Sequence, residues 1–98
     1  MTPRRLTTQD VKAAVCAQFK VPLDAMTSAR RNRAVARPRQ VAMYLTRKMV
    51  GRSTLDIGHR FGGRDHTTVI HALRQIEKLR AIDADLDADI TAVERALG

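Results

Sequence analysis

A helix, a glycine turn and a second helix are indicated by residues 57–73, IGHRFGGRDHTTVIHAL. Ile57 and Phe61 lie one helical turn apart, and the two glycines that follow Phe61 end the first helix. The second helix carries apolar residues at helical spacing: Val69, Ala72, Leu73, Ile76 and Leu79. Gly58 has no side chain to keep the two helices apart. This pattern predicts a helix-turn-helix, although its connection is one residue longer than in the tightest versions.

The polar residues Asp65 to Thr68 begin the second helix, and three kinds of site fit such residue types. A phosphate-binding P-loop is excluded, because the sequence contains no G-x-x-x-x-G-K-[ST] pattern. A metal site is disfavoured, because His66 and His71 point about 140° apart on a helix and the chain has a single, distant cysteine. We therefore predict no metal and no cofactor.

The third kind of site is an exposed helix tip that enters the major groove of DNA. The carboxylate of Asp65 can accept hydrogen bonds from cytosine or adenine amino groups, and His66 can contact a base edge. Thr67 and Thr68 offer hydroxyls to bases and methyl groups to thymine. The motif alone is equally compatible with a structural role, in which Asp65 is an N-cap and the threonines fill the first turn.

The charge of the chain favours a polyanionic partner. Lys and Arg number 18 against 10 Asp and Glu, a formal net charge of +8. Residues 30–64 hold ten of the basic residues and a single acid, Asp56, whereas residues 81–98 hold five acids and one arginine. A positive block this concentrated steers a domain onto phosphates and makes binding dependent on salt. The alternative is a solvated basic surface without a partner.

Length and composition predict one all-α domain over residues 1–98. A chain of this length can bury one modest core. Aromatic residues make up only 3% of it, so the core must be aliphatic, which favours packed helices over a β-sandwich. The apolar spacing predicts six helical segments and no strand.

Helix boundaries in the first half follow from threonines, prolines and glycine. Thr7 and Thr8 precede a first amphipathic helix, and a single extra turn is expected near residues 23–26. Residues 27–40 are too charged and irregular to pack as a helix, so a basic loop is expected there. Pro38 would then lie in the first turn of the next helix, which ends near Gly51.

The second half begins with a capping pattern at Ser53, which opens the short first helix of the helix-turn-helix. Leu55, Ile57 and Phe61 are expected to be its apolar anchors. After the long second helix, Asp83 can cap a final helix that buries one apolar face.

Several classes of protein are excluded or disfavoured. No run of eighteen apolar residues exists for a membrane span, and the N-terminus lacks the apolar stretch of a signal peptide. The single cysteine, Cys16, precludes an internal disulfide and suits a reducing cytoplasm. No paired carboxylates, activated nucleophile or cofactor fingerprint indicates an enzyme or a small-molecule substrate. Because no heptad seam is visible, we predict a monomer.

Two stretches of the sequence carry a family resemblance: ARRNRAVARPRQVAMYL (residues 29–45) and IGHRFGGRDHTTVIHALRQIEKL (residues 57–79). They resemble the C-terminal DNA-binding domain of the bacterial chromosomal replication initiator DnaA, and the similarity extends from about Leu6 to Leu97. The resemblance implies sequence-specific binding of double-stranded DNA at DnaA boxes, which are short, asymmetric and A·T-rich. It also implies a role in replication initiation or its regulation, at the nucleoid in the cytoplasm.

The resemblance further implies a division of labour among the polar residues. The major groove would be contacted by Arg64, Asp65, His66, Thr67 and Thr68. Arg31 would enter the adjacent minor groove, where narrow A·T-rich tracts attract guanidinium groups. Phosphates would be held by Arg30, Arg33, Arg37, Arg39, Gln40 and Arg47. The N-terminus of the helix expected after Pro38 would add backbone N–H groups to that grip.

Other roles stay open alongside DNA binding. An initiator also contains an ATPase, whereas this sequence has no nucleotide-binding motif. We expect either an excised fragment or, given the numbering from Met1, a stand-alone relative that competes for boxes or regulates transcription. An adaptor that works mainly through replication-regulatory proteins is a second hypothesis. Its docking segment would carry the acids Asp83, Asp85, Asp87, Asp89 and Glu94, which alternatively form a solvated helix face.

Overall fold

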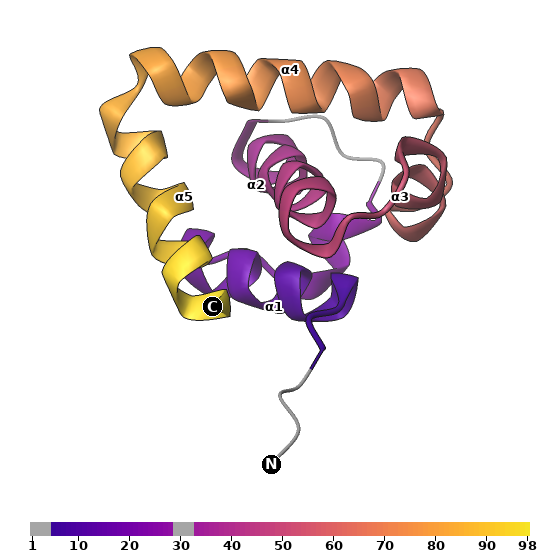
Figure 1. Ribbon diagram of the computed structural model, residues 1–98, viewed down its shortest axis with the longest axis horizontal. Coiled ribbons are helices and arrows are strands. Elements are labelled where there is room, and N and C mark those ends of the chain that lie inside the picture. The colour runs from indigo at the N-terminus through magenta and orange to yellow at the C-terminus, as the bar shows by residue number, and fades with distance from the viewer. Residues whose placement is uncertain (1–4, 29–32) are drawn as a thin grey trace.

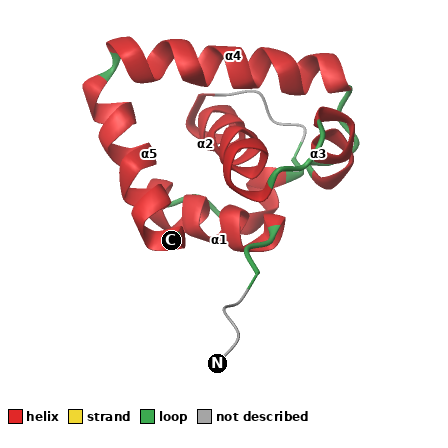
Figure 2. Cartoon of the chain, in the orientation of Figure 1, coloured by secondary structure: helices red, strands yellow, loops and turns green. Residues whose placement is uncertain are grey.

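The computed structural model describes residues 5–28 and 33–98, which fold into helices joined by short turns (Figure 1 and Figure 2). The helical elements are, in chain order, α1 (Thr8–Phe19), η1 (Leu23–Met26), α2 (Arg33–Leu45), η2 (Thr46–Val50), α3 (Thr54–Arg60), α4 (His66–Ile82) and α5 (Ala84–Leu97). No strand occurs in this described part of the chain, and the predicted all-α fold is confirmed. Over the same residues no helix is long and apolar enough to cross a lipid bilayer.

Helix α2 lies in the centre of the molecule, and the other helices surround it (Figure 1). It packs against α1 on one side and α4 on another, while α5 closes the structure by packing against both α1 and α4. Helix α3 packs against α4 beside its N-terminal end. The predicted helix-turn-helix is therefore formed by α3 and α4, joined by the turn at residues 61–65.

The core is aliphatic, as the scarcity of aromatic residues predicts. Ile57 of α3 and Phe61, its C-cap, are fully buried in the same core cluster as Val69 of α4, and Phe61 is the aromatic member of this cluster. Leu55, by contrast, is 60% exposed, and its prediction as an apolar anchor is wrong. Two positions along a helix rotate a side chain by about 200°, so Leu55 faces solvent when Ile57 faces the core.

Side chains placed just before the helices satisfy their first backbone N–H groups. Thr7 and Asp10 form a capping box at the start of α1, with reciprocal hydrogen bonds of 3.2 and 3.0 Å. The Ser53 hydroxyl caps α3, and the Asp83 carboxylate caps α5 by accepting from the Leu86 N–H at 3.0 Å. The predicted starts at Ser53 and Asp83 are confirmed.

The start of α2 differs from the sequence prediction. The helix begins at Arg33, so residues 33–37, expected in a basic loop, are helical, and Pro38 is buried inside the helix rather than in its first turn. A proline there removes one hydrogen bond to the carbonyl of Ala34. Burial offsets that cost, because Val35 packs against the core on the same face as Pro38 and the buried Ala42. Alanines at three nearby positions also favour the helical backbone.

The turn between α3 and α4 depends on the absence of side chains. Gly62 and Gly63 have φ angles of +90° and +72°, in the left-handed region that favours glycine. The Arg64 N–H donates to the carbonyl of Gly58 at 2.8 Å, which brings the turn back onto α3. A Cβ at Gly58 would lie 2.1 Å from the Arg64 carbonyl oxygen. Gly58 therefore does permit close approach, and the backbone that approaches it is the turn itself.

We expect Gly58→Ala to lower the free energy of unfolding by about 1–3 kcal/mol. The clash with backbone at 2.1 Å outweighs the gain in helix propensity of about 1 kcal/mol that alanine brings. Urea denaturation followed by circular dichroism measures the change. Gly98→Ala, where nothing lies within 4 Å of the added Cβ, is the matched control. A Gly58→Ala protein as stable as the wild type would contradict the close contact.

An ion-pair network holds α4, α5 and η2 together at the end of α4 distant from the turn. Arg80 pairs with Asp87 at 2.6 Å and with Glu94 at 3.1 Å, and Lys48 reaches Glu94 at 2.6 Å. The side chains of Arg80 and Glu94 are only 18% and 20% exposed. Burial by itself raises the pKa of Glu94, but the hydrogen bonds from Arg80 and Lys48 outweigh it and leave the pKa lowered.

Because the folded pKa of Glu94 is lowered, the carboxylate stabilises the fold above its ordinary pKa, and this contribution is lost as the pH falls. At pH 7 we expect Glu94→Gln to reduce stability by about 1–3 kcal/mol. The difference from wild type should narrow below about pH 4.3, the ordinary pKa of a glutamate. Thermal melts across this range test it, with the exposed Glu77→Gln as control. A difference that is constant with pH would exclude an ionic role for Glu94.

Candidate nucleic-acid interface

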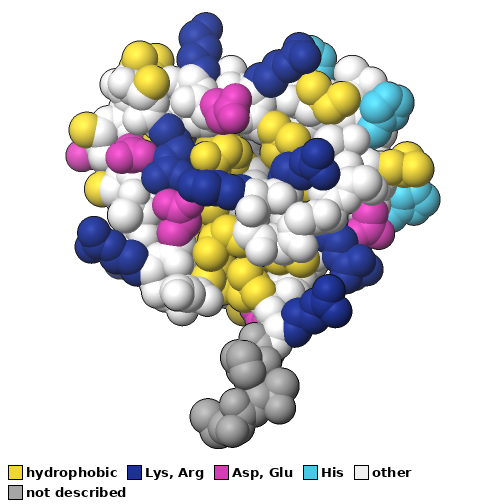
Figure 3. Space-filling model, in the orientation of Figure 1, with side chains coloured by type: hydrophobic (Ala, Val, Ile, Leu, Met, Phe, Trp, Pro, Cys, Tyr) yellow, Lys and Arg dark blue, Asp and Glu magenta, His cyan; other side chains and the backbone are white. Residues whose placement is uncertain are grey.

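The first turn of α4 forms an exposed polar tip, as the sequence predicts. Asp65, His66, Thr67 and Thr68 are all exposed, and the side chains of Asp65 and His66 retain 67% and 58% of their accessible surface. Histidine side chains gather on the side of the molecule where α3 and the start of α4 lie (Figure 3). The tip therefore presents hydrogen-bonding groups to solvent at the end of a rigid helix.

Asp65 caps α4 while it remains exposed. Its Oδ1 accepts a hydrogen bond from the Thr67 N–H at 3.0 Å and lies 3.0 Å from Nδ1 of His66. The backbone hydrogen bond from Thr67 lowers the pKa of Asp65, and the neighbouring His66 adds to this effect. The capping role is thus present in the structure. A carboxylate has about four acceptor positions, so a cap and a base contact can be made by the same side chain.

Arg64 does not share the exposed surface of the four residues that follow it. Its guanidinium donates to the carbonyl of Phe61 and to the carbonyl of Ser28, and burial lowers its pKa. The resemblance implied a major-groove contact for Arg64. In the structure the Arg64 guanidinium instead donates to two backbone carbonyls, because the tight turn directs the side chain toward Phe61 and Ser28.

Arg39 is likewise directed inward. It is 6% exposed, and its Nε donates to the carbonyl of Ala25 at 3.1 Å. Burial, followed by the nearby charge of Arg64, lowers its pKa. These contacts disagree with the predicted phosphate contact at Arg39. The helix N-terminus expected at Pro38 is also absent from that place, because α2 begins five residues earlier.

The other predicted phosphate-binding residues divide into two groups. Arg47 is exposed on η2 and donates to the Arg52 carbonyl at 2.9 Å, while Arg37 donates to Oε1 of Gln40 at 2.9 Å on the partly exposed side of α2. These side chains are accessible to a phosphate. Arg30 and the side chain of Arg33 lie outside the described residues, as does Arg31, the residue predicted to enter the minor groove.

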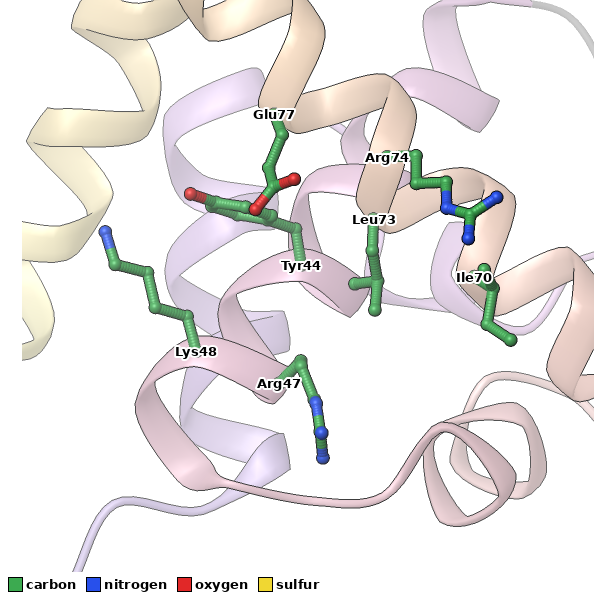
Figure 4. A pocket seen from close by; sticks show the side chains of 7 residues that line it. All are labelled: Tyr44, Arg47, Lys48, Ile70, Leu73, Arg74 and Glu77. Atoms are coloured by element: carbon green, nitrogen blue, oxygen red, sulfur yellow. The ribbon is translucent and has the colours of Figure 1, made fainter.

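A groove that the sequence did not suggest lies between α2–η2 and the middle of α4. It has a volume of about 480 Å³ and is lined by Tyr44, Arg47, Lys48, Ile70, Leu73, Arg74 and Glu77. Figure 4 shows the side chains of Arg47 and Lys48 extending from one wall and those of Leu73 and Arg74 from the other. Residues more than twenty positions apart form it, so no local pattern could reveal it. One of the basic residues that line the groove, Arg47, is also a predicted phosphate contact.

The acidic segment makes mainly intramolecular contacts. Asp83 caps α5, Asp87 and Glu94 bind Arg80, and Asp89 accepts from the side-chain amide of Gln18 at 3.0 Å. These contacts give the acids a role in holding α5 against α4 and α1. Within the described residues, no three His, Cys, Asp or Glu side chains are grouped closely enough to hold a metal ion.

Comparisons with known proteins agree with this geometry. Residues 8–76 match the family model described as bacterial dnaA protein helix-turn-helix. The chain is 54% identical over 94 residues to the chromosomal replication initiator protein DnaA of Zymomonas mobilis, which covers 96% of this chain and 19% of that protein. It is 55% identical over 93 residues to the DnaA of Sphingopyxis alaskensis, covering 95% and 20%, and 50% identical over 94 residues to that of Caulobacter vibrioides, covering 96% and 19%.

The match spans both helices of the helix-turn-helix, together with α1 and α2, which support it. The chain spans about a fifth of the length of these relatives. The family is defined by a DNA-binding motif rather than a catalytic one, in agreement with the prediction that this domain is not an enzyme. The chain belongs to the bacterial DnaA helix-turn-helix family.

Proposed function

We propose that this protein binds double-stranded DNA sequence-specifically at DnaA-box-like sites and acts in replication initiation or its regulation. Membership in the DnaA helix-turn-helix family supports DNA binding in replication initiation. The observation that carries the specific proposal is the exposed tip of α4, where four consecutive polar side chains stand next to a helix-turn-helix turn. Nucleoid association follows from the same proposal.

The tip supplies the chemistry that base recognition in the major groove needs. Asp65 provides an acceptor for cytosine N4 or adenine N6, and His66 can donate or accept at a base edge. Thr67 and Thr68 provide hydroxyls, and their methyl groups suit the thymine methyl. Asp65 is the N-cap and the other three residues form the first turn of a 17-residue helix, so the backbone that carries them is ordered before DNA binds.

Two further sets of contacts complete the proposed complex. Arg31 enters the minor groove beside the box, a role that rests on the family resemblance because this residue lies outside the described part of the structure. Arg30, Arg33, Arg37, Gln40 and Arg47 hold phosphates on either side. Arg39 is left out of these sets because it is buried, and Arg64 because its guanidinium joins two backbone carbonyls in a partly buried position, whereas Arg47 is exposed.

An adaptor role through replication-regulatory proteins receives less support. The acids proposed for docking are largely engaged with Arg80 and Gln18 or with a helix end. Transcription regulation and competition with an initiator for boxes both remain forms of the same DNA-binding activity. We propose that the protein binds as a monomer, since an asymmetric site requires no two-fold partner.

His66→Ala should reduce the preference for a box over random duplex by about 1–3 kcal/mol, because it removes a base contact. Arg47→Ala should weaken both duplexes about equally and reduce the slope of log affinity against log salt by about 1, because it removes a phosphate contact. Fluorescence anisotropy titrations at several salt concentrations measure both quantities.

His71→Ala removes an exposed histidine further along α4 and is the control for His66; Arg95→Ala removes an exposed cation from α5 and is the control for Arg47. His71→Ala should leave the preference for the box unchanged, and Arg95→Ala should leave the salt slope unchanged. Equal effects of His66→Ala and Arg47→Ala on box and random DNA would refute the assigned roles. A wild-type protein without any box preference would refute the proposed function.

The two roles of Asp65 can be separated by comparing Asp65→Asn with Asp65→Ala. Asparagine keeps an N-cap oxygen, so Asp65→Asn should unfold at nearly the wild-type temperature, whereas Asp65→Ala should unfold at a lower one. Asp65→Ala should lose box preference, because it has no acceptor for a cytosine or adenine amino group, whereas Asp65→Asn, whose amide oxygen can still accept, should lose less of it. Wild-type preference in Asp65→Ala would show that Asp65 acts as a cap alone.

A further inference from the structure

We propose that Arg64 is a positioning residue that fastens residues 27–28 to the helix-turn-helix turn, so that the chain leading to the proposed minor-groove residue Arg31 leaves from a fixed position beside the tip of α4. The inference rests on the proposed function for its consequence in DNA binding. The contact itself is independent of DNA. It assigns Arg64 a role different from the base contact that the resemblance implies.

The guanidinium of Arg64 joins two segments that are far apart in the sequence. One acceptor is the carbonyl of Phe61, the residue that ends α3. The other is the carbonyl of Ser28, 36 residues earlier in the chain. Ser28 directly precedes the stretch that contains Arg30 and Arg31. A single planar group therefore links the turn before α4 to Ser28, three residues before the proposed minor-groove arginine in the sequence.

The two segments also touch directly. A Cβ added at Gly62 would lie 2.7 Å from the carbonyl oxygen of Thr27, 3.2 Å from its Cα and 2.8 Å from Nη1 of Arg64. Only a residue without a side chain allows this approach. The backbone of Arg64 is fixed as well, because its N–H donates to Gly58 at 2.8 Å. The backbone of Arg64 is thus held in the turn, and its side chain is held by the two carbonyls that accept from it.

A second arginine holds the same segment from the opposite direction. Arg39 of α2 donates from Nε to the carbonyl of Ala25 at 3.1 Å, three residues before Ser28. Burial lowers the pKa of Arg39, and the positive charge of Arg64 lowers it further. Residues 25–28 are therefore held at one end by the central helix and at the other by the helix-turn-helix turn.

The chemistry of the link requires a guanidinium. Its planar fork donates to two carbonyls at once from a fixed geometry, whereas a lysine ammonium is a point charge on a flexible stem. Losing the link would let residues 27–28 and the tip of α4 move relative to each other. The residues for the major groove and the residue for the minor groove would then each lose conformational entropy separately on binding DNA.

The test is a double-mutant cycle on box and random duplexes, with Arg64→Ala and Arg64→Lys each combined with Arg31→Ala in the full chain. We expect both Arg64 variants to weaken box binding about tenfold with the salt slope unchanged, because no phosphate contact is lost. Arg31→Ala should cost less in either Arg64 background than in wild type. Discrimination lost at one base pair only, or full rescue by lysine, would overturn the proposal in favour of a direct contact.

Amide hydrogen exchange of the free protein gives a readout that does not depend on DNA. Arg64→Ala should speed exchange around Thr27 and Ser28, while the exchange of α5 stays at the wild-type rate. Unchanged exchange at Thr27 and Ser28 would overturn the clamp, whatever the DNA results. A wild-type protein without box preference, but with faster exchange in Arg64→Ala, would instead refute the proposed function and leave the clamp in place.

Discussion

The contact between the backbone of Gly58 and the backbone of Arg64 determines where the rest of the binding surface lies. The 2.8 Å hydrogen bond between them folds the chain back onto α3, and the carbonyl of Arg64 occupies the space that a Cβ would need. From this point the chain continues into α4, with Asp65 as its N-cap. Phe61, the C-cap of α3, is fully buried in the core. The position of the exposed tip thus follows from a close approach in the backbone.

Features that depend on neighbouring residues could be predicted from the sequence. Ile57 and Phe61 are buried because residues one turn apart share a helix face. The cap at Asp83 is also local, since its acceptor is the backbone of the next turn. The exposed tip belongs to the same class: polar residues that begin a helix after a glycine turn have no apolar partner to cover them.

Features that depend on tertiary contacts could not be predicted in the same way. Arg39, Arg47 and Arg64 belong to the same basic stretch of the sequence, which does not distinguish them. In the structure Arg47 is accessible, whereas Arg39 and Arg64 donate to the carbonyls of Ala25 and Ser28, which are distant in the sequence. Pro38 inside α2 is another case, because the packing of its face against the core decides that the helix begins before it. A cluster of basic residues in the sequence therefore predicts a positive surface. It does not predict which way each arginine side chain points.

The N-cap of α4 has a consequence for the energetics of recognition. The hydrogen bond from the Thr67 N–H to the Asp65 carboxylate restricts the side-chain torsions of Asp65 in the unbound protein. A side chain that is already ordered loses little conformational entropy when a ligand contacts it. This single hydrogen bond therefore both caps the helix and orders the Asp65 side chain for contact with a base edge. A replacement that weakens the cap would also make the side chain at this position less ordered.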